Sequence, residues 1–243
     1  MNRTASVLTL IAIACAAYAV ADLTHETLGH GGACLASGGR VLLVDTTFED
    51  CSVRSRWIDG AGPLVGIAVA LLAWLGARNA KTANWRAFLV LLFADAMFWN
   101  IGYLIKSGIA WAGDWHFLTE GLEPANVWHI GLAVAGIALY FAAMRMLAYI
   151  WPAGRGMPSG QFAIMAYLTA AILSAAAGFF DPRGPHAILS DALPSSLAAI
   201  GLPLVGLRQR AEVGIAPSPA WIVAGAISAV VFVAILGPGI RGG

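Results

Sequence analysis

Seven apolar stretches run through this chain, and each is close to the length that crosses a lipid bilayer. A transmembrane α-helix needs about 20 mostly apolar residues. Only 11% of the 243 residues are charged, whereas soluble domains carry about 25%. The expected spans are residues 4–36, 62–77, 85–112, 127–150, 162–180, 189–207 and 220–236. The sequence therefore predicts an all-α polytopic membrane protein of six or seven transmembrane helices, forming one transmembrane domain over residues 1–243.

Two of these stretches differ from a simple membrane helix. The sixth is the least regular, because Pro194 and Pro203 each remove a backbone hydrogen bond from a helix. The first is longer than a bilayer requires, so its C-terminal part is expected to reach an aqueous surface or to kink. A polar loop with β-strand character follows it, as far as Trp57.

The basic residues indicate how the chain is oriented, because Lys and Arg near helix ends favour the cytoplasm. In a seven-span arrangement one side carries Arg3, Arg78, Lys81, Arg86, Arg145, Arg155, Arg208 and Arg210, while most acidic residues lie on the other. We expect the N-terminus to be cytoplasmic and the membrane to be a plasma membrane, the inner membrane of a bacterium. The lipid bilayer is the expected environment, and the lack of a soluble basic face excludes nucleic acid as a partner.

Two of the three cysteines, Cys34 and Cys51, flank the first loop on the acidic side. In an oxidising compartment they could form a disulfide that closes this loop, although sequence alone gives no distance between them.

A cluster of ionisable residues lies at the end of the first stretch, where Asp22, His25, Glu26 and His30 fall within nine positions. Such groups are costly in a membrane, by about 2.5–3.5 kcal/mol for an Asp at its centre, and usually mark function. Zinc hydrolases use two neutral imidazoles on one helix face and an adjacent carboxylate that takes a proton from water. His25 and His30 are therefore candidate metal ligands, and Glu26 is a candidate general base.

The spacing His-Glu-x-x-x-His is one residue longer than the usual zinc motif. On a regular α-helix, residues five apart diverge by about 140°. A π-bulge would bring them nearly into line, and Gly29 could also relax the turn.

Other interpretations of the cluster remain open. On a regular helix Glu26 and His30 share a face, so Glu26 could be a ligand and His25 a supporting or proton-transfer group. The four groups could also form a hydrogen-bonded network that joins helices, or be the remnant of a former site.

The motif and the segments after it resemble the site-2 protease family of intramembrane zinc metalloproteases. His25-Glu26-Thr27-Leu28-Gly29-His30 is followed by Gly38-Gly39-Arg40-Val41 and then by Ala61-Gly62-Pro63-Leu64-Val65-Gly66. Farther on, Asn100-Ile101-Gly102-Tyr103 and Gly113-Asp114-Trp115 resemble the family segment that supplies a third ligand. The resemblance covers residues 1–115 as a protease-like core and leaves residues 116–243 as additional helices.

The resemblance implies a zinc ion bound by His25, His30 and Asp114, with Asp95 as the rival third ligand. Glu26 would be the catalytic general base. The implied activity is an intramembrane zinc metalloprotease that cleaves membrane-embedded segments of partner proteins. The alternative is a non-catalytic membrane protein, such as an assembly factor or a protein that handles small solutes or protons, which uses the cluster for structure or binding.

Overall fold

The structure is a computed structural model that describes residues 3–242. Seven of its helical segments are long and apolar enough to cross a membrane, and the expected fold class is confirmed. These segments are Arg3–Ala36, Arg56–Asn79, Ala83–Ala110, Ala125–Tyr149, Ser159–Gly178, Ile188–Gly206 and Pro219–Leu236.

Several of these segments are divided into shorter elements. The helices are α1 (Arg3–Leu23), π-helix η1 (Thr24–Gly31), α2 (Gly32–Ala36), α3 (Arg56–Asn79), α4 (Ala83–Ala110), α5 (Asp114–Thr119), α6 (Ala125–Tyr149), α7 (Ser159–Gly178), π-helix η2 (Ile188–Ala192), α8 (Leu193–Leu197), 3₁₀-helix η3 (Ala198–Ile200), α9 (Gly201–Gly206), α10 (Pro219–Val231) and π-helix η4 (Phe232–Leu236). The strands are β1 (Val41–Val44), β2 (Glu49–Cys51), β3 (Met157–Pro158), β4 (Glu212–Val213) and β5 (Ile240–Arg241).

Local sequence explains where the long helices begin. The hydroxyl groups of Ser55, Thr82 and Ser218 accept hydrogen bonds from the first backbone N–H groups of α3, α4 and α10. The second span therefore starts six residues before the expected residue 62, because a capped polar turn precedes its apolar part. In the sixth span the chain kinks at Ala199, between two short helices whose first turns hold Pro194 and Pro203.

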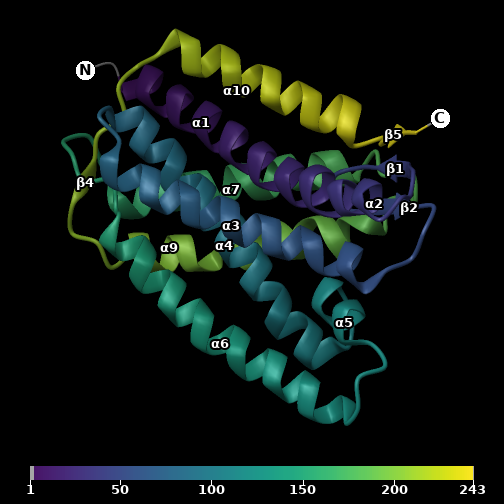
Figure 1. The fold of residues 1–243 in the computed structure, drawn as a ribbon. Coiled ribbons are helices and arrows are strands. Elements are labelled where there is room, and N and C mark those ends of the chain that lie inside the picture. Colours follow the sequence, from purple (N-terminus) through teal and green to yellow (C-terminus); the bar gives the residue numbers. More distant parts are fainter. Residues whose placement is uncertain (1–2, 243) are drawn as a thin grey trace.

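Helix α4 lies at the centre of the bundle and is the most buried of the spans, packed between α3 and α6 (Figure 1). Helices α6 and α10 are the least buried, and their exposed apolar side chains suit contact with lipid. The main buried apolar cluster joins residues from both halves of the chain, from Leu10 to Ile215. Residues from both halves of the chain therefore share one core.

Two small sheets lie at opposite ends of the bundle. Strand β1 pairs with β2 and with the C-terminal strand β5, both antiparallel, in the order β2-β1-β5. At the other end β3 pairs with β4. Figure 1 shows the two chain ends at opposite ends of the bundle, as an odd number of spans requires. The predicted β-character of the loop after the first span is confirmed.

Candidate metal centre

Three of the four residues of the polar cluster, His25, Glu26 and His30, lie on a π-helix, η1, which covers Thr24–Gly31. A π-helix has about one more residue per turn than an α-helix, so residues five apart share a face. The Nε2 atoms of His25 and His30 are 3.1 Å apart. Of the geometries that the sequence left open, the structure shows the π-bulge, and the one-residue-longer spacing brings the two imidazoles together.

Asp114 reaches the two histidines from a different part of the chain. Helix α4 ends at Ala110, the next residue Trp111 has a left-handed backbone conformation, and Gly113 then turns the chain into the short helix α5. The Oδ2 atom of Asp114 lies 3.3 Å from Nε2 of His25 and 3.7 Å from Nε2 of His30. The rival ligand Asp95 is buried but makes no ion pair with either histidine in the described part of the chain.

The other ring nitrogens define the tautomers of both histidines. His25 Nδ1 lies 2.7 Å from the Asn100 Oδ1 atom, and Asn100 donates from its Nδ2 atom to the Ala96 carbonyl. His30 Nδ1 lies 2.7 Å from the Ile58 carbonyl oxygen. Both partners are acceptors, so each Nδ1 carries a hydrogen and each neutral ring presents a lone pair at Nε2.

Three electron-pair donors therefore converge on one point: two Nε2 lone pairs and one carboxylate oxygen. Such a group is stable only with a cation between its members, either a proton or a metal ion. Within residues 3–242, Asp114 Oδ2 is buried without a hydrogen-bond partner. Burial alone would raise the pKa of the Asp114 carboxyl, but interactions with His25 and His30, when these rings carry a proton in place of a metal ion, hold the pKa well below its usual range.

Glu26 adjoins the three donors. Its Oε1 atom is 3.8 Å from His25 Nε2, and the residue is only 4% exposed. His25, Glu26 and His30 each offer a ligand atom within 4.8 Å of the others, so these residues could hold a metal ion. Asp22, one turn earlier, is also buried, and its Oδ2 atom has no hydrogen-bond partner among the described residues.

Neighbouring aromatic side chains fix the cluster in place. The indole of Trp99 stacks on the His25 ring, with ring centroids 4.3 Å apart. Trp115, next to Asp114, donates from Nε1 to the Asn100 carbonyl over 2.9 Å and so ties α5 to α4. Trp99, Asn100 and Trp115 thus act together to orient His25 and to anchor the segment that carries Asp114.

Glycines let the three helical segments approach closely enough to form the site. A Cβ atom added at Gly62 would collide with the His30 ring, and one at Gly66 would collide with the Asn100 amide. A Cβ atom at Gly29 would meet the backbone of Gly62 at 2.5 Å. The Gly62/Gly66 pair therefore accommodates polar site residues as well as a helix contact.

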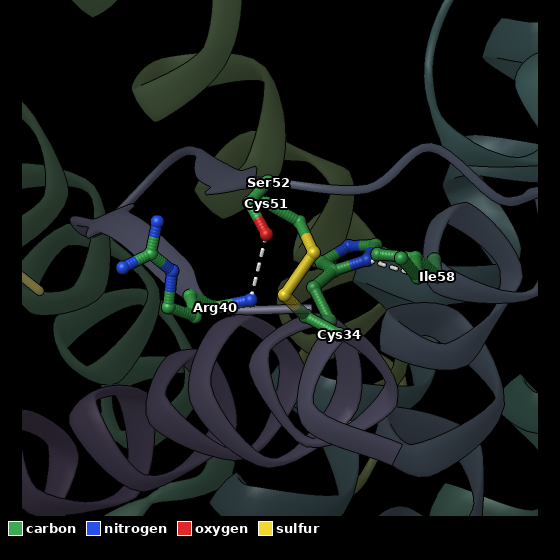
Figure 2. The surroundings of a disulfide bond; sticks show 6 residues. Cys34, Arg40, Cys51, Ser52 and Ile58 are labelled. Atoms are coloured by element: carbon green, nitrogen blue, oxygen red, sulfur yellow. Dashed lines mark hydrogen bonds between the residues drawn. A yellow bond between two sulfur atoms is a disulfide. The ribbon is translucent and has the colours of Figure 1, made fainter. Parts of the chain in front are cut away.

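A disulfide joins Cys34 to Cys51 beside the cluster, so the pairing that the sequence left open is present. Figure 2 shows this bond together with the hydrogen bond from the Arg40 backbone to Ser52 Oγ. Cys34, Glu49 and Cys51 are also close enough to hold a metal ion. Oxidised sulfur atoms are not thiolate ligands, so this second group is a covalent link between η1/α2 and the β1–β2 hairpin.

The structure brings His25, Glu26, His30 and Asp114 together and leaves Asp95 apart. Sequence reasoning missed two contributors, the Ile58 carbonyl and the Trp99 ring. A backbone carbonyl has no signature in a sequence, and Trp99 is one of nine tryptophans in an apolar chain. The chain matches no protein-family model, no curated protein and no solved structure.

Proposed function

We propose that this protein is an intramembrane zinc metalloprotease whose metal is held by His25, His30 and Asp114. The observation that carries the proposal is the triangle formed by their three donor atoms, with edges of 3.1, 3.3 and 3.7 Å. Ligands at about 2.0–2.1 Å from a tetrahedral zinc ion lie about 3.3–3.4 Å from one another. The triangle therefore has the dimensions of one face of such a tetrahedron.

The surroundings of the triangle also suit a metal ligand set. Metal-bound histidines normally donate their second ring N–H to a carbonyl or carboxylate, which fixes the tautomer. His25 and His30 do so to Asn100 and Ile58. Zinc bound by three protein ligands keeps a further coordination position, and there it lowers the pKa of water and polarises a carbonyl group.

Each residue of the site has a task in peptide hydrolysis. Glu26, buried beside the triangle, would accept a proton from the attacking water at its carboxylate and later donate it to the leaving amine. Asn100 and Ile58 would hold the two imidazoles in their ligating tautomers. The substrate would be an unwound transmembrane or juxtamembrane segment, because a regular helix keeps its scissile carbonyl within its own hydrogen bonds.

We also propose that the site faces the outside of a plasma membrane, with the N-terminus in the cytoplasm. The loops, helix ends and chain end on the N-terminal side carry eight basic residues and one acidic residue, and those on the side of the metal centre carry six basic and nine acidic residues. The Cys34–Cys51 disulfide also lies on the site's side, and disulfides persist in oxidising compartments.

The test begins with metal content. Purified protein should hold about one zinc ion per chain by mass spectrometry, and His25→Ala, His30→Ala and Asp114→Ala should each lose it. Glu26→Gln should retain zinc, because the carboxylate acts on the water and is not a ligand.

Activity is then measured in liposomes with a panel of single-span peptides that carry a fluorophore and a quencher on either side of the span. Cleavage should require zinc, stop with a chelator, and fall at least 100-fold in Glu26→Gln. A wild-type protein that takes up no zinc after reloading contradicts the proposal. If the protein binds zinc but wild type and Glu26→Gln give equal fluorescence signals, the proposed peptidase activity is contradicted, whereas the proposed zinc site is not.

One observation favours a second candidate, a non-catalytic protein that handles protons or small cations. Asp22 and Asp95 are buried acidic residues that the proposed zinc ligand set does not use, and ionisable groups within a membrane often line proton or ion pathways. This candidate predicts that the site binds no zinc and that Asp22→Asn and Asp95→Asn abolish proton or cation flux into liposomes.

A further inference from the structure

The end of the bundle opposite the metal centre contains a cavity that the proposed protease function does not use. Its volume is about 440 Å³, within the range of small-ligand sites. The cavity lies between the start of α1, the start of α7 and the β3–β4 sheet. Its lining is mainly apolar, with Val7, Met157, Pro158, Val213 and Ile215, and its polar members include Arg3, Ser6 and Gln161.

Two polar groups in the lining lack partners in the part of the chain that the structure describes. Arg3 makes no ion pair with any residue from 3 to 242, although a guanidinium group has five N–H donors. Ser6 is 4% exposed, and its buried hydroxyl has no hydrogen-bond partner within the same range. A buried hydroxyl without a partner is costly, so both groups are suited to bind a ligand with acceptor oxygens.

The position of the cavity indicates what kind of ligand this is. Arg3 begins the first membrane span, so the cavity opens at the level of the lipid headgroups on the more basic side of the protein. Arg155 directly precedes the lining residue Gly156, and Arg208 and Arg210 lie just before β4. The acidic residue in this region, Glu212, is engaged by the backbone N–H of Gly156.

We propose that this cavity binds the headgroup of an anionic phospholipid, with Arg3 pairing with the phosphate and Ser6 donating to one of its oxygens. The apolar part of the lining would contact the glycerol and the beginning of an acyl chain. A cationic and hydroxyl-bearing rim above an apolar floor matches an amphiphile better than a soluble anion, which would leave the floor without a partner.

The site would also connect lipid composition to the metal centre. Arg3 and Ser6 lie on α1, and the same continuous helical segment carries His25, Glu26 and His30. Bound lipid would hold the start of this segment, while the cluster lies near its other end. The lipid proposal itself stands or falls independently of the protease proposal.

The test measures the thermal unfolding midpoint of the full-length protein in neutral detergent as phosphatidylglycerol is added. The shift should saturate, and phosphatidylcholine should give a much smaller one. Arg3→Gln should weaken the apparent affinity for phosphatidylglycerol about fivefold, since each basic residue near anionic lipid contributes roughly that factor. Arg3→Lys should retain most of the affinity, and Ser6→Ala should reduce it.

Arg145→Gln is the matched control, because Arg145 is an exposed arginine at the same end of the bundle that does not line the cavity. It should leave the affinity unchanged. Equal losses in Arg3→Gln and Arg145→Gln would show general surface attraction and overturn the proposal. An equal shift of the unfolding midpoint with phosphatidylcholine would overturn the proposal as well. So would an equal shift with glycerol phosphate alone, which would identify a soluble anion as the ligand.

Discussion

Asn100 is the residue on which the orientation of His25 depends. Its Oδ1 atom accepts from His25 Nδ1, its Nδ2 atom donates to Ala96, and its backbone carbonyl accepts from Trp115. These bonds hold one imidazole and, through Trp115, the start of the helix that carries Asp114. Two of the three proposed ligands are therefore positioned by a residue that does not touch the metal position.

Asn100→Ala should lower zinc affinity by about 10- to 100-fold, the usual effect of losing a group that orients a ligand. Zinc affinity is measured by competition with a chelating dye. Asn84→Ala is the control, because Asn84 is also buried on α4 and makes two hydrogen bonds, but to Ala216 at the opposite end. Asn84→Ala should lower stability and leave zinc affinity unchanged. A similar zinc affinity in both variants would contradict the assigned role.

The residues of the candidate site differ in how well the sequence alone predicted them. His25, Glu26 and His30 stand out because ionisable groups are rare in apolar stretches. Asp114 and Asp95 were both plausible third ligands, and only the resemblance favoured Asp114. The geometry separates them, because the turn at Trp111 and Gly113 brings Asp114 back over the bundle. Backbone turns of this kind depend on tertiary packing, which residue spacing does not describe.

At the scale of elements, the β1–β2 hairpin is tied to the loop after α7 by a compact polar cluster. Thr47 donates to Asp181, Arg183 pairs with Asp181 at 2.8 Å, and Arg183 also lies over the Phe48 ring. Asp45 accepts a hydrogen bond from the Thr47 backbone N–H at its Oδ1 atom, while its buried Oδ2 atom has no hydrogen-bond partner in residues 3–242. The hairpin is therefore held by Asp181 and Arg183, and the Asp45 charge is only partly compensated.

Asp45→Asn should stabilise the protein at neutral pH. Burial raises the pKa of Asp45 from 3.8 to about 6, so the folded state favours the protonated form. The preference of the folded state for protonated Asp45 stabilises the protein fully below about pH 4, and this stabilisation is lost as the pH rises through 6. Asparagine keeps the Oδ1 acceptor and removes the charge. The free energy of unfolding should rise by up to about 3 kcal/mol at about pH 7.5 and change little at about pH 4.

Asp181→Asn is the control, because it should change the free energy of unfolding at neutral pH in the opposite direction. Burial would raise the pKa of Asp181, but its bonds to Arg183 and Thr47 lower it below the usual value. Its contribution to stability is present at neutral pH and is lost as the pH falls through that lowered pKa. Asp181→Asn should therefore destabilise the protein near neutral pH. Denaturant or thermal unfolding in detergent measures both effects, and an Asp45→Asn variant less stable than wild type at neutral pH would contradict the argument.

The elements themselves were largely predictable from sequence. All seven spans occur close to their expected positions because bilayer thickness fixes the length of an apolar helix. The π-helix was one of several open geometries, and the structure selects it. The pairing of β5 with β1 was not predicted, since strands of two residues leave almost no pattern in a sequence.

For the whole molecule, strand pairing constrains the topology independently of hydropathy. Strand β1 follows the first span and β5 follows the seventh, and they pair. Strand β3 follows the fourth span and β4 follows the sixth, and they also pair. Paired strands lie on the same side of the membrane, so an even number of spans must separate them. Six spans separate β1 from β5 and two separate β3 from β4, as an arrangement of seven crossings provides.

The orientation of this arrangement can be tested with reporter fusions. A C-terminal alkaline phosphatase, which is active only outside the cytoplasm, should be active, and a C-terminal fluorescent protein that matures only in the cytoplasm should stay dark. The same reporters fused after Ala80, in the loop between α3 and α4, should give the reverse result. The excess of basic residues on that side provides the physical reason. An active phosphatase after Ala80 would place the metal centre on the cytoplasmic side, where the Cys34–Cys51 disulfide would not be expected to persist.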